Sequence, residues 1–148
     1  MDQKERQILV SIISSVLIIG AYVLYVYQRQ VAGNFEILDD FSFWGKTFLK
    51  LIPVAIVAQI VIHIIYAIIN RIITNEDIPS KDDERDKLIE LKSIQISHWI
   101  FVSGFVTAMV FLALGSKPSV MFITIFVSGF IACMVSEIAK FIFYRRGF

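Results

Sequence analysis

Four polar residues recur along one apolar segment at spacings that place them on one face of a helix. They are Gln59, His63, Tyr66 and Asn70, and the steps between them keep them within about 60° of one another around the helix axis. In lipid each group needs a hydrogen-bond partner, so this polar stripe should face the interior of a helix bundle. We favour hydrogen bonding between helices as its role, over a wet vestibule for a ligand or proton.

A second candidate for chemistry is Glu137, the one carboxylate well inside an apolar segment. Lys140 follows three positions later on the same helical face, so the two side chains should form an ion pair. If that pair opened toward His63 and His98, two imidazoles and a carboxylate could build a proton relay or a metal site. The histidines are expected at different depths, His98 near the interface, which argues against haem. We predict no metal and no cofactor.

The usual signatures of enzymes are missing from the sequence. It contains no glycine-rich phosphate loop, no nucleophile elbow, no HExxH and no pair of cysteines with metal spacing. Cys133 is the single cysteine and is interpreted as a small packing residue. The chain is therefore predicted to be non-enzymatic.

The composition indicates which elements carry these residues. Of 148 residues, 57% are hydrophobic and 18% charged, and the mean hydropathy is +0.72, whereas soluble domains are about 45–50% apolar and about 25% charged. These values predict one all-α domain, an integral membrane four-helix bundle that leaves no room for a soluble catalytic domain. We expect spans over residues 7–31, 46–73, 94–115 and 119–144, with an outer loop over 32–45 and a cytoplasmic turn and helix extension over 74–93.

The distribution of positive charge predicts the orientation. Ten of the 14 lysines and arginines fall on one side of the predicted spans, against Arg29, Lys46, Lys50 and Lys117 on the other. The positive-inside rule places the ten in the cytoplasm, so both termini should lie there, in the cell inner (cytoplasmic) membrane. The net charge of +1 makes nucleic acid an unsuitable direct ligand.

The charged segment SKDDERDKLIELKSIQIS is the most distinctive stretch of the chain. Ser80 and Asp83 have the spacing of a capping box, so the third helix is predicted to begin near Ser80, in water, and to extend into the cytoplasm. A solvated, self-paired helical extension is the favoured interpretation. The alternative is a net-acidic docking surface for a basic partner. Its candidate residues are Asp82, Asp83, Glu84, Asp86, Leu88 and Leu91.

The six residues IFVSGF occur twice, at 100–105 and again at 125–130. In antiparallel neighbours the two copies would place small residues at similar depth, where backbones can approach closely. The candidate packing positions are Gly104, Ala108, Ser128, Gly129 and Ala132. The pattern leaves open whether they pack within one bundle or between protomers of a homo-oligomer. An inverted repeat around a transport site is the less favoured alternative.

Two stretches, Asp83-Glu84-Arg85-Asp86-Lys87-Leu88-Ile89-Glu90-Leu91-Lys92 and the closing Tyr144-Arg145-Arg146-Gly147-Phe148, carry a resemblance. The chain resembles an uncharacterised family of small bacterial and archaeal membrane proteins, in which a DERDxLIELK-like segment precedes the third of four spans. Members are often encoded beside a helix-turn-helix regulator. The resemblance therefore implies a cytoplasmic regulator of that kind as a partner, besides the lipid bilayer, and it implies no ligand residues.

Two functions remain as expectations. The first is a sensor or regulatory membrane protein whose bundle responds to a signal and whose segment 80–92 engages the cytoplasmic regulator. The second is a small oligomeric transporter coupled to protons or ions, which the polar stripe and Glu137 suggest.

Overall fold

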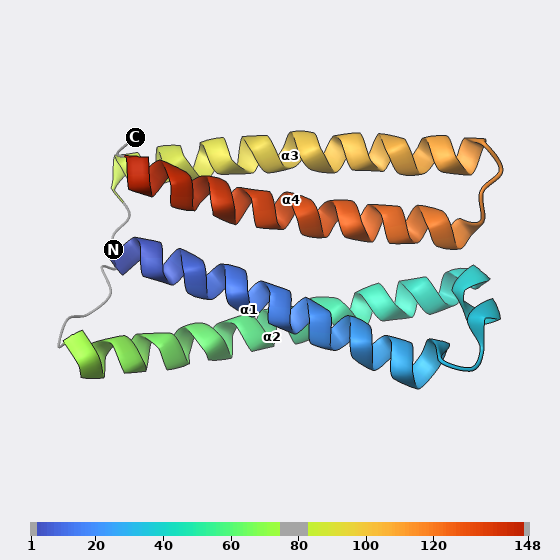
Figure 1. Ribbon diagram of the computed structural model, residues 1–148, viewed down its shortest axis with the longest axis horizontal. Coiled ribbons are helices and arrows are strands. Elements are labelled where there is room, and N and C mark those ends of the chain that lie inside the picture. The colour runs from blue at the N-terminus through green and yellow to red at the C-terminus, as the bar shows by residue number, and fades with distance from the viewer. Residues whose placement is uncertain (1–2, 75–82, 147–148) are drawn as a thin grey trace.

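The computed structural model describes residues 3–74 and 83–146, and these residues are helical apart from short connections. Four long helices run antiparallel in sequence order (Figure 1). They are α1 (Gln3–Val26), α2 (Phe41–Thr74), α3 (Glu84–Ala113) and α4 (Pro118–Arg146). A π-helical turn, η1 (Tyr27–Val31), prolongs α1, and a 3-10 turn, η2 (Phe35–Asp39), leads into α2.

All four helices are long and apolar enough to cross a membrane. Within these helices, residues 7–26, 51–70, 93–113 and 118–136 contain no Asp, Glu, Lys or Arg. About 20 residues at a rise of about 1.5 Å match the hydrocarbon thickness of a bilayer. Within the most apolar window of each helix, at most 11% of the residues are buried inside the protein. The apolar side chains therefore point mainly outward, as those of a helix surrounded by lipid do.

Helices α3 and α4 form the closest pair in the molecule and lie side by side along their length (Figure 1). The repeated segments meet in this pair, because a Cβ atom at Gly104 would lie 2.0 Å from Ser128 Oγ and 2.3 Å from Ser128 Cβ. Ala108 and Ala132 are also buried. Gly104 therefore packs within one bundle, which answers the question that the sequence left open for this residue.

Helix α1 joins this pair to α2. It contacts both α4 and α2, whereas α2 crosses α1 and packs mainly against it (Figure 1). α2 begins at Phe41, before the predicted start at Lys46, because Asp40 accepts a hydrogen bond from the Ser42 N–H and caps the first turn. The predicted outer loop over 32–45 is accordingly shorter and partly helical.

Aromatic side chains close the bundle at the end opposite the termini. Trp44 stacks on Phe122 with ring centroids 5.4 Å apart, and Phe48 stacks on Phe126 at 5.8 Å. The Trp44 indole donates a hydrogen bond to the Leu38 carbonyl, so its polar N–H is satisfied while the ring is buried. The start of α2 is thereby held against α4.

A polar contact ties the same end together. Lys117 Nζ lies 2.9 Å from Asp39 Oδ2, and the Ser119 hydroxyl donates to Asp39 Oδ1 at 3.2 Å. The Lys117 hydrogen bond and charge, with the Ser119 hydrogen bond, lower the pKa of Asp39 despite the opposing effect of desolvation. Asp39 is therefore charged at neutral pH and links η2 to the connection between α3 and α4.

The start of α3 differs from the prediction. Asp83 is the N-cap residue, with extended backbone (φ −73°, ψ 164°), and its carboxylate accepts from the Glu84 N–H, while Asp86 accepts from the Asp83 N–H. The capping box is thus Asp83 with Asp86, so the predicted pair of Ser80 with Asp83 is wrong, and Ser80 itself lies outside the described residues. α3 begins beside the end of α4, and is packed there instead of projecting alone (Figure 1).

The contact between Gly104 and Ser128 yields a test of the fold. Gly104→Ala should lower the free energy of unfolding by about 1–3 kcal/mol, because its new Cβ would overlap the Ser128 side chain. Thermal unfolding followed by circular dichroism in detergent measures this loss.

Gly129→Ala is the matched control, since its Cβ would make an ordinary contact with the Phe101 ring at 3.7 Å. Adding Ser128→Gly to Gly104→Ala should restore part of the loss. Equal stability of the two alanine variants would contradict this packing.

Candidate functional site: a polar cavity between the four helices

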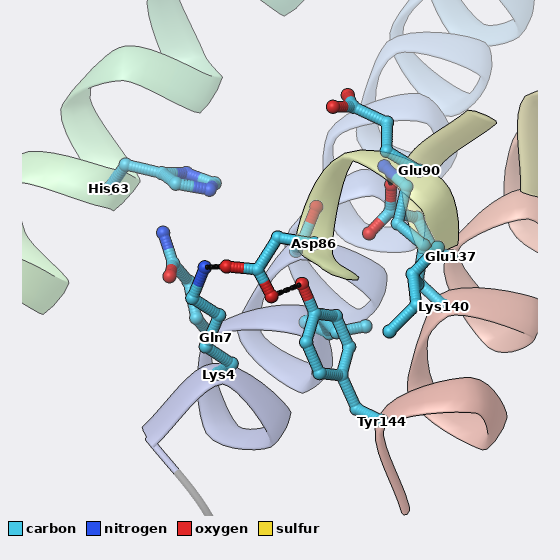
Figure 2. Close-up of a pocket in the computed structure, with 11 residues that line it drawn as sticks. Lys4, Gln7, His63, Asp86, Glu90, Glu137, Lys140 and Tyr144 are labelled. Carbon is cyan, nitrogen blue, oxygen red and sulfur yellow. Dashed lines mark hydrogen bonds and ion pairs between the residues drawn. The ribbon is translucent and has the colours of Figure 1, made fainter. Parts of the chain in front are cut away.

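All four helices contribute to a cavity of about 330 Å³ at the end that holds both termini. We call it the polar cavity, and Figure 2 shows its lining side chains. The lining consists of Lys4, Gln7, Ile8 and Ser11 of α1, His63 of α2, Asp86, Ile89 and Glu90 of α3, and Glu137, Lys140 and Tyr144 of α4.

A three-residue network forms one wall of the polar cavity. Asp86 is the acceptor for both partners: Lys4 pairs with its Oδ2, and the Tyr144 hydroxyl donates to its Oδ1 at 2.7 Å (Figure 2). The side chains of Lys4 and Asp86 are 22% and 14% exposed. This partial burial makes the pair more consequential than a surface ion pair, which is commonly worth little. The network joins α1, α3 and α4.

The local sequence of α3 explains why Asp86 faces inward. Asp86, Ile89 and Ser93 recur at spacings of three and four residues, and Ile89 and Ser93 are fully buried on that face. Ser93 donates to the Ile89 carbonyl, so no unsatisfied hydroxyl is left there. A carboxylate in the first turn also interacts favourably with the positive end of the helix dipole.

The predicted ion pair on α4 is confirmed. Lys140 Nζ lies 3.0 Å from Glu137 Oε1, with both side chains about one-fifth exposed, at 22% and 18%. Both residues line the polar cavity. The cavity wall thus holds a second pair of opposite charges, deeper along α4 than Tyr144.

The polar stripe of α2 is divided between two roles. The side-chain amide of Gln59 forms two hydrogen bonds with α1. Its Oε1 accepts from the Ser14 hydroxyl at 3.1 Å, and its Nε2 donates to Ser15 Oγ at 2.7 Å. This is the interhelical hydrogen bonding that the sequence favoured. His63 instead lines the polar cavity, with Nδ1 3.0 Å from the carbonyl oxygen of Gln59 (Figure 2).

The remaining stripe residues lie toward the end of α2. Asn70 is buried, at 6% exposure. The Tyr66 hydroxyl is enclosed and has no hydrogen-bond partner among residues 3–74 and 83–146. Neither residue lines the polar cavity.

The two histidines are not brought together. His98 is exposed on α3 beside Trp99, and it does not line the polar cavity that His63 enters. Among the described residues, no group of three or more His, Cys, Asp or Glu side chains could hold a metal ion. A site built jointly on His63 and His98 has no geometric support.

The predicted docking residues separate into inward and outward positions. Asp86 is held in the network and Asp83 caps α3, whereas Glu84 is exposed and Leu88 and Leu91 are 57% and 67% exposed. Asp82 lies outside the described residues. Because Lys4 neutralises Asp86, the exposed charges over 83–92 balance, and the net-acidic surface predicted from sequence is not found in that range.

Comparisons of the chain with protein-family models, with curated proteins and with solved structures find no match. The interpretation of this site therefore stands on its own geometry.

Several residues of the site were missed by the sequence reasoning. Lys4 was counted only for orientation, and Ser14, Ser15 and Tyr144 were given no contact. The inward face of α3 could have been found, because Asp86 shares its face with Ile89 and Ser93. The sequence could not identify Lys4 and Tyr144 as the partners of Asp86, because their pairing depends on how α1 packs beside α3 and α4.

The network predicts a measurable coupling between α1 and α3. Asp86→Asn and Lys4→Gln should each lower the free energy of unfolding by about 1–3 kcal/mol, because each leaves a partly buried charge without the opposite charge that it pairs with. The double variant should lose less than the sum of the two, which a double-mutant cycle in detergent measures.

Glu90→Gln is the control, since Glu90 is an exposed carboxylate on the same helix. Strictly additive losses for Lys4 and Asp86 would show that the pair contributes nothing in solution.

Proposed function

We propose that this chain is a non-enzymatic, multi-pass membrane protein that senses a polar ligand in the polar cavity and signals through the start of α3 to a cytoplasmic transcription regulator. It would cross the inner (cytoplasmic) membrane four times, with both termini in the cytoplasm. The observation that carries the proposal is the position of Asp86, which lines the cavity and also caps the first turn of α3.

The charge distribution supports this membrane orientation. Among the described residues, every lysine and arginine except Arg29, Lys46, Lys50 and Lys117 lies at the end of the bundle that holds the termini. That end is cytoplasmic under the positive-inside rule. The polar cavity would then open at the cytoplasmic side, and the aromatic side chains around Trp44 would close the opposite side.

The network supplies a path from ligand to partner. An ion or polar headgroup that enters the cavity would compete for Lys4, Asp86 or Tyr144, because these residues line the cavity and bind one another. When Asp86 exchanges partners, the capping box at Asp83 changes with it, because Asp86 accepts from the Asp83 N–H at 3.1 Å. Ligand binding would therefore shift the population of α3 start conformations.

The outward face of the same turns is available to a partner. Leu88, Leu91 and Ile94 are each more than half exposed and recur every three residues. An apolar stripe next to the charged first turn suits a groove on a folded regulator, in the manner of a helix docked by its apolar face. The resemblance supplies the candidate partner, a helix-turn-helix regulator.

Purification of the chain together with that regulator tests the proposal. Leu88→Ser combined with Leu91→Ser should reduce the regulator recovered by on the order of tenfold, because it removes two exposed apolar contacts. Quantitative pull-down from detergent extracts measures the recovery.

Leu114→Ser is the control, since Leu114 is 77% exposed and is the C-cap residue at the opposite end of α3. The docking surface is wrong if the Leu88/Leu91 double variant and the Leu114 variant recover the regulator equally.

One observation also favours a second function, a small oligomeric proton- or ion-coupled transporter. Glu137 and His63 both line the polar cavity, so a carboxylate and an imidazole face the same space. A transporter would need this chamber to open alternately to both sides.

For that function, Glu137→Gln should abolish proton-coupled uptake in proteoliposomes, because the carboxyl group that would bind the proton is gone. A fluorescent pH indicator inside the vesicles measures the flux, with Glu36→Gln as the control at the opposite end of the bundle. Undiminished flux in Glu137→Gln would remove this residue from the coupling step.

A further inference from the structure

A second recess, unrelated to the polar cavity, lies between α1 and α2 toward the end with the aromatic side chains. Its deep part is a crevice of about 710 Å³, and its mouth is a polar hollow of about 190 Å³. Gln30 and Lys50 line both, so the two parts adjoin at these residues. We call the whole the lipid crevice.

The deep part is almost entirely apolar. Besides Gln30 and Lys50, it is lined by Ile18, Ala21, Tyr22, Tyr25, Pro53, Val54 and Ala58. The small side chains of Ala21 and Ala58, together with Pro53, leave space between the two crossing helices. The Tyr22 hydroxyl donates to the Thr47 carbonyl at 2.7 Å, so its polar group is satisfied and the ring presents apolar surface. The crevice therefore suits hydrocarbon.

The mouth carries an excess of positive charge. Lys46 and Lys50 lie four residues apart on one face of α2, both are exposed, and neither has an ion-pair partner among the described residues. The one carboxylate of the mouth, Asp40, accepts a hydrogen bond from the Ser42 N–H and faces the positive end of α2. Lys46 and Lys50 against Asp40 leave the mouth with a net charge of +1 for an anionic ligand, and Gln30 and Ser42 add neutral hydrogen-bonding groups.

The depth of the mouth agrees with a lipid headgroup. Lys50 immediately precedes the uncharged stretch 51–70 of α2, so it stands where the hydrocarbon region would begin. An anionic headgroup at Lys46 and Lys50 would direct its acyl chain along Val54 and Ala58 into the crevice. A free phosphate would leave this apolar surface uncovered.

We propose that the lipid crevice binds one anionic phospholipid, with its phosphate at Lys46 and Lys50 and an acyl chain between α1 and α2. The site rests on the proposed membrane placement of the chain and is independent of the proposed regulatory role. Under the proposed orientation, the lipid belongs to the leaflet opposite the termini.

Native mass spectrometry of the full chain, released from detergent with added lipid, tests the site. The probes are phosphatidylglycerol, phosphatidylcholine and phosphatidylethanolamine with the same acyl chains, and soluble glycerol phosphate as a competitor. We expect a single retained phosphatidylglycerol, much weaker retention of the two zwitterionic lipids, and no displacement by glycerol phosphate.

Two variants test the two halves of the lipid crevice. Lys46→Gln with Lys50→Gln should weaken phosphatidylglycerol binding by on the order of tenfold, because both cations are lost. Ala21→Phe should weaken it while leaving the lysines in place, because the ring fills the space for the chain. Arg29→Gln is the control, since it removes a positive charge at the same end from a residue that does not line the crevice.

The outcomes separate the proposals. Equal retention of all three lipids, equal loss in Arg29→Gln and the double lysine variant, or displacement by glycerol phosphate would overturn the lipid crevice. Reconstitution of the chain into phosphatidylcholine vesicles tests the membrane placement separately. Failure to enter these vesicles would overturn that placement and not the choice of lipid.

Discussion

The ion pair of Lys4 with Asp86 is the contact on which the arrangement of this protein depends. Helices whose apolar side chains face outward gain little from association in lipid, because lipid tails are as apolar as leucine. Polar contacts and close backbone approach must then determine which helices are neighbours. Asp86 connects the starts of α1 and α3 with the end of α4, and Gly104 against Ser128 brings α3 and α4 together at mid-height.

The two ends of the bundle consequently differ in the chemistry of their side chains. At the end with the termini, charged and hydrogen-bonding groups surround a cavity that remains open. At the other end, Trp44 stacks on Phe122 and the Phe48 ring packs at an angle to both, while Asp39 and Lys117 form an exposed ion pair. The polar cavity and the aromatic side chains therefore lie at opposite ends of the bundle.

Much of the fold could be predicted from the sequence, because charge-free stretches and small-residue spacing are local properties. Such local properties predict the four helices, the Glu137–Lys140 pair and the packing role of Gly104. The start of α3 was misplaced because Ser80 and Asp83 obey the same spacing rule as Asp83 and Asp86, and only backbone conformation distinguishes them. The cavity was missed because Lys4 and Asp86 are joined by packing of distant helices, which no periodicity encodes.

The loose attachment of α2 has a consequence for biosynthesis. Along most of its length α2 packs against α1, and α3 packs more tightly against α4, so the bundle consists of two helical hairpins. Lys4 can pair with Asp86 only after the chain has been made as far as α3, and Tyr144 joins this network only after α4 has been made. The polar cavity therefore forms only when the two hairpins pack together, because its lining comes from both.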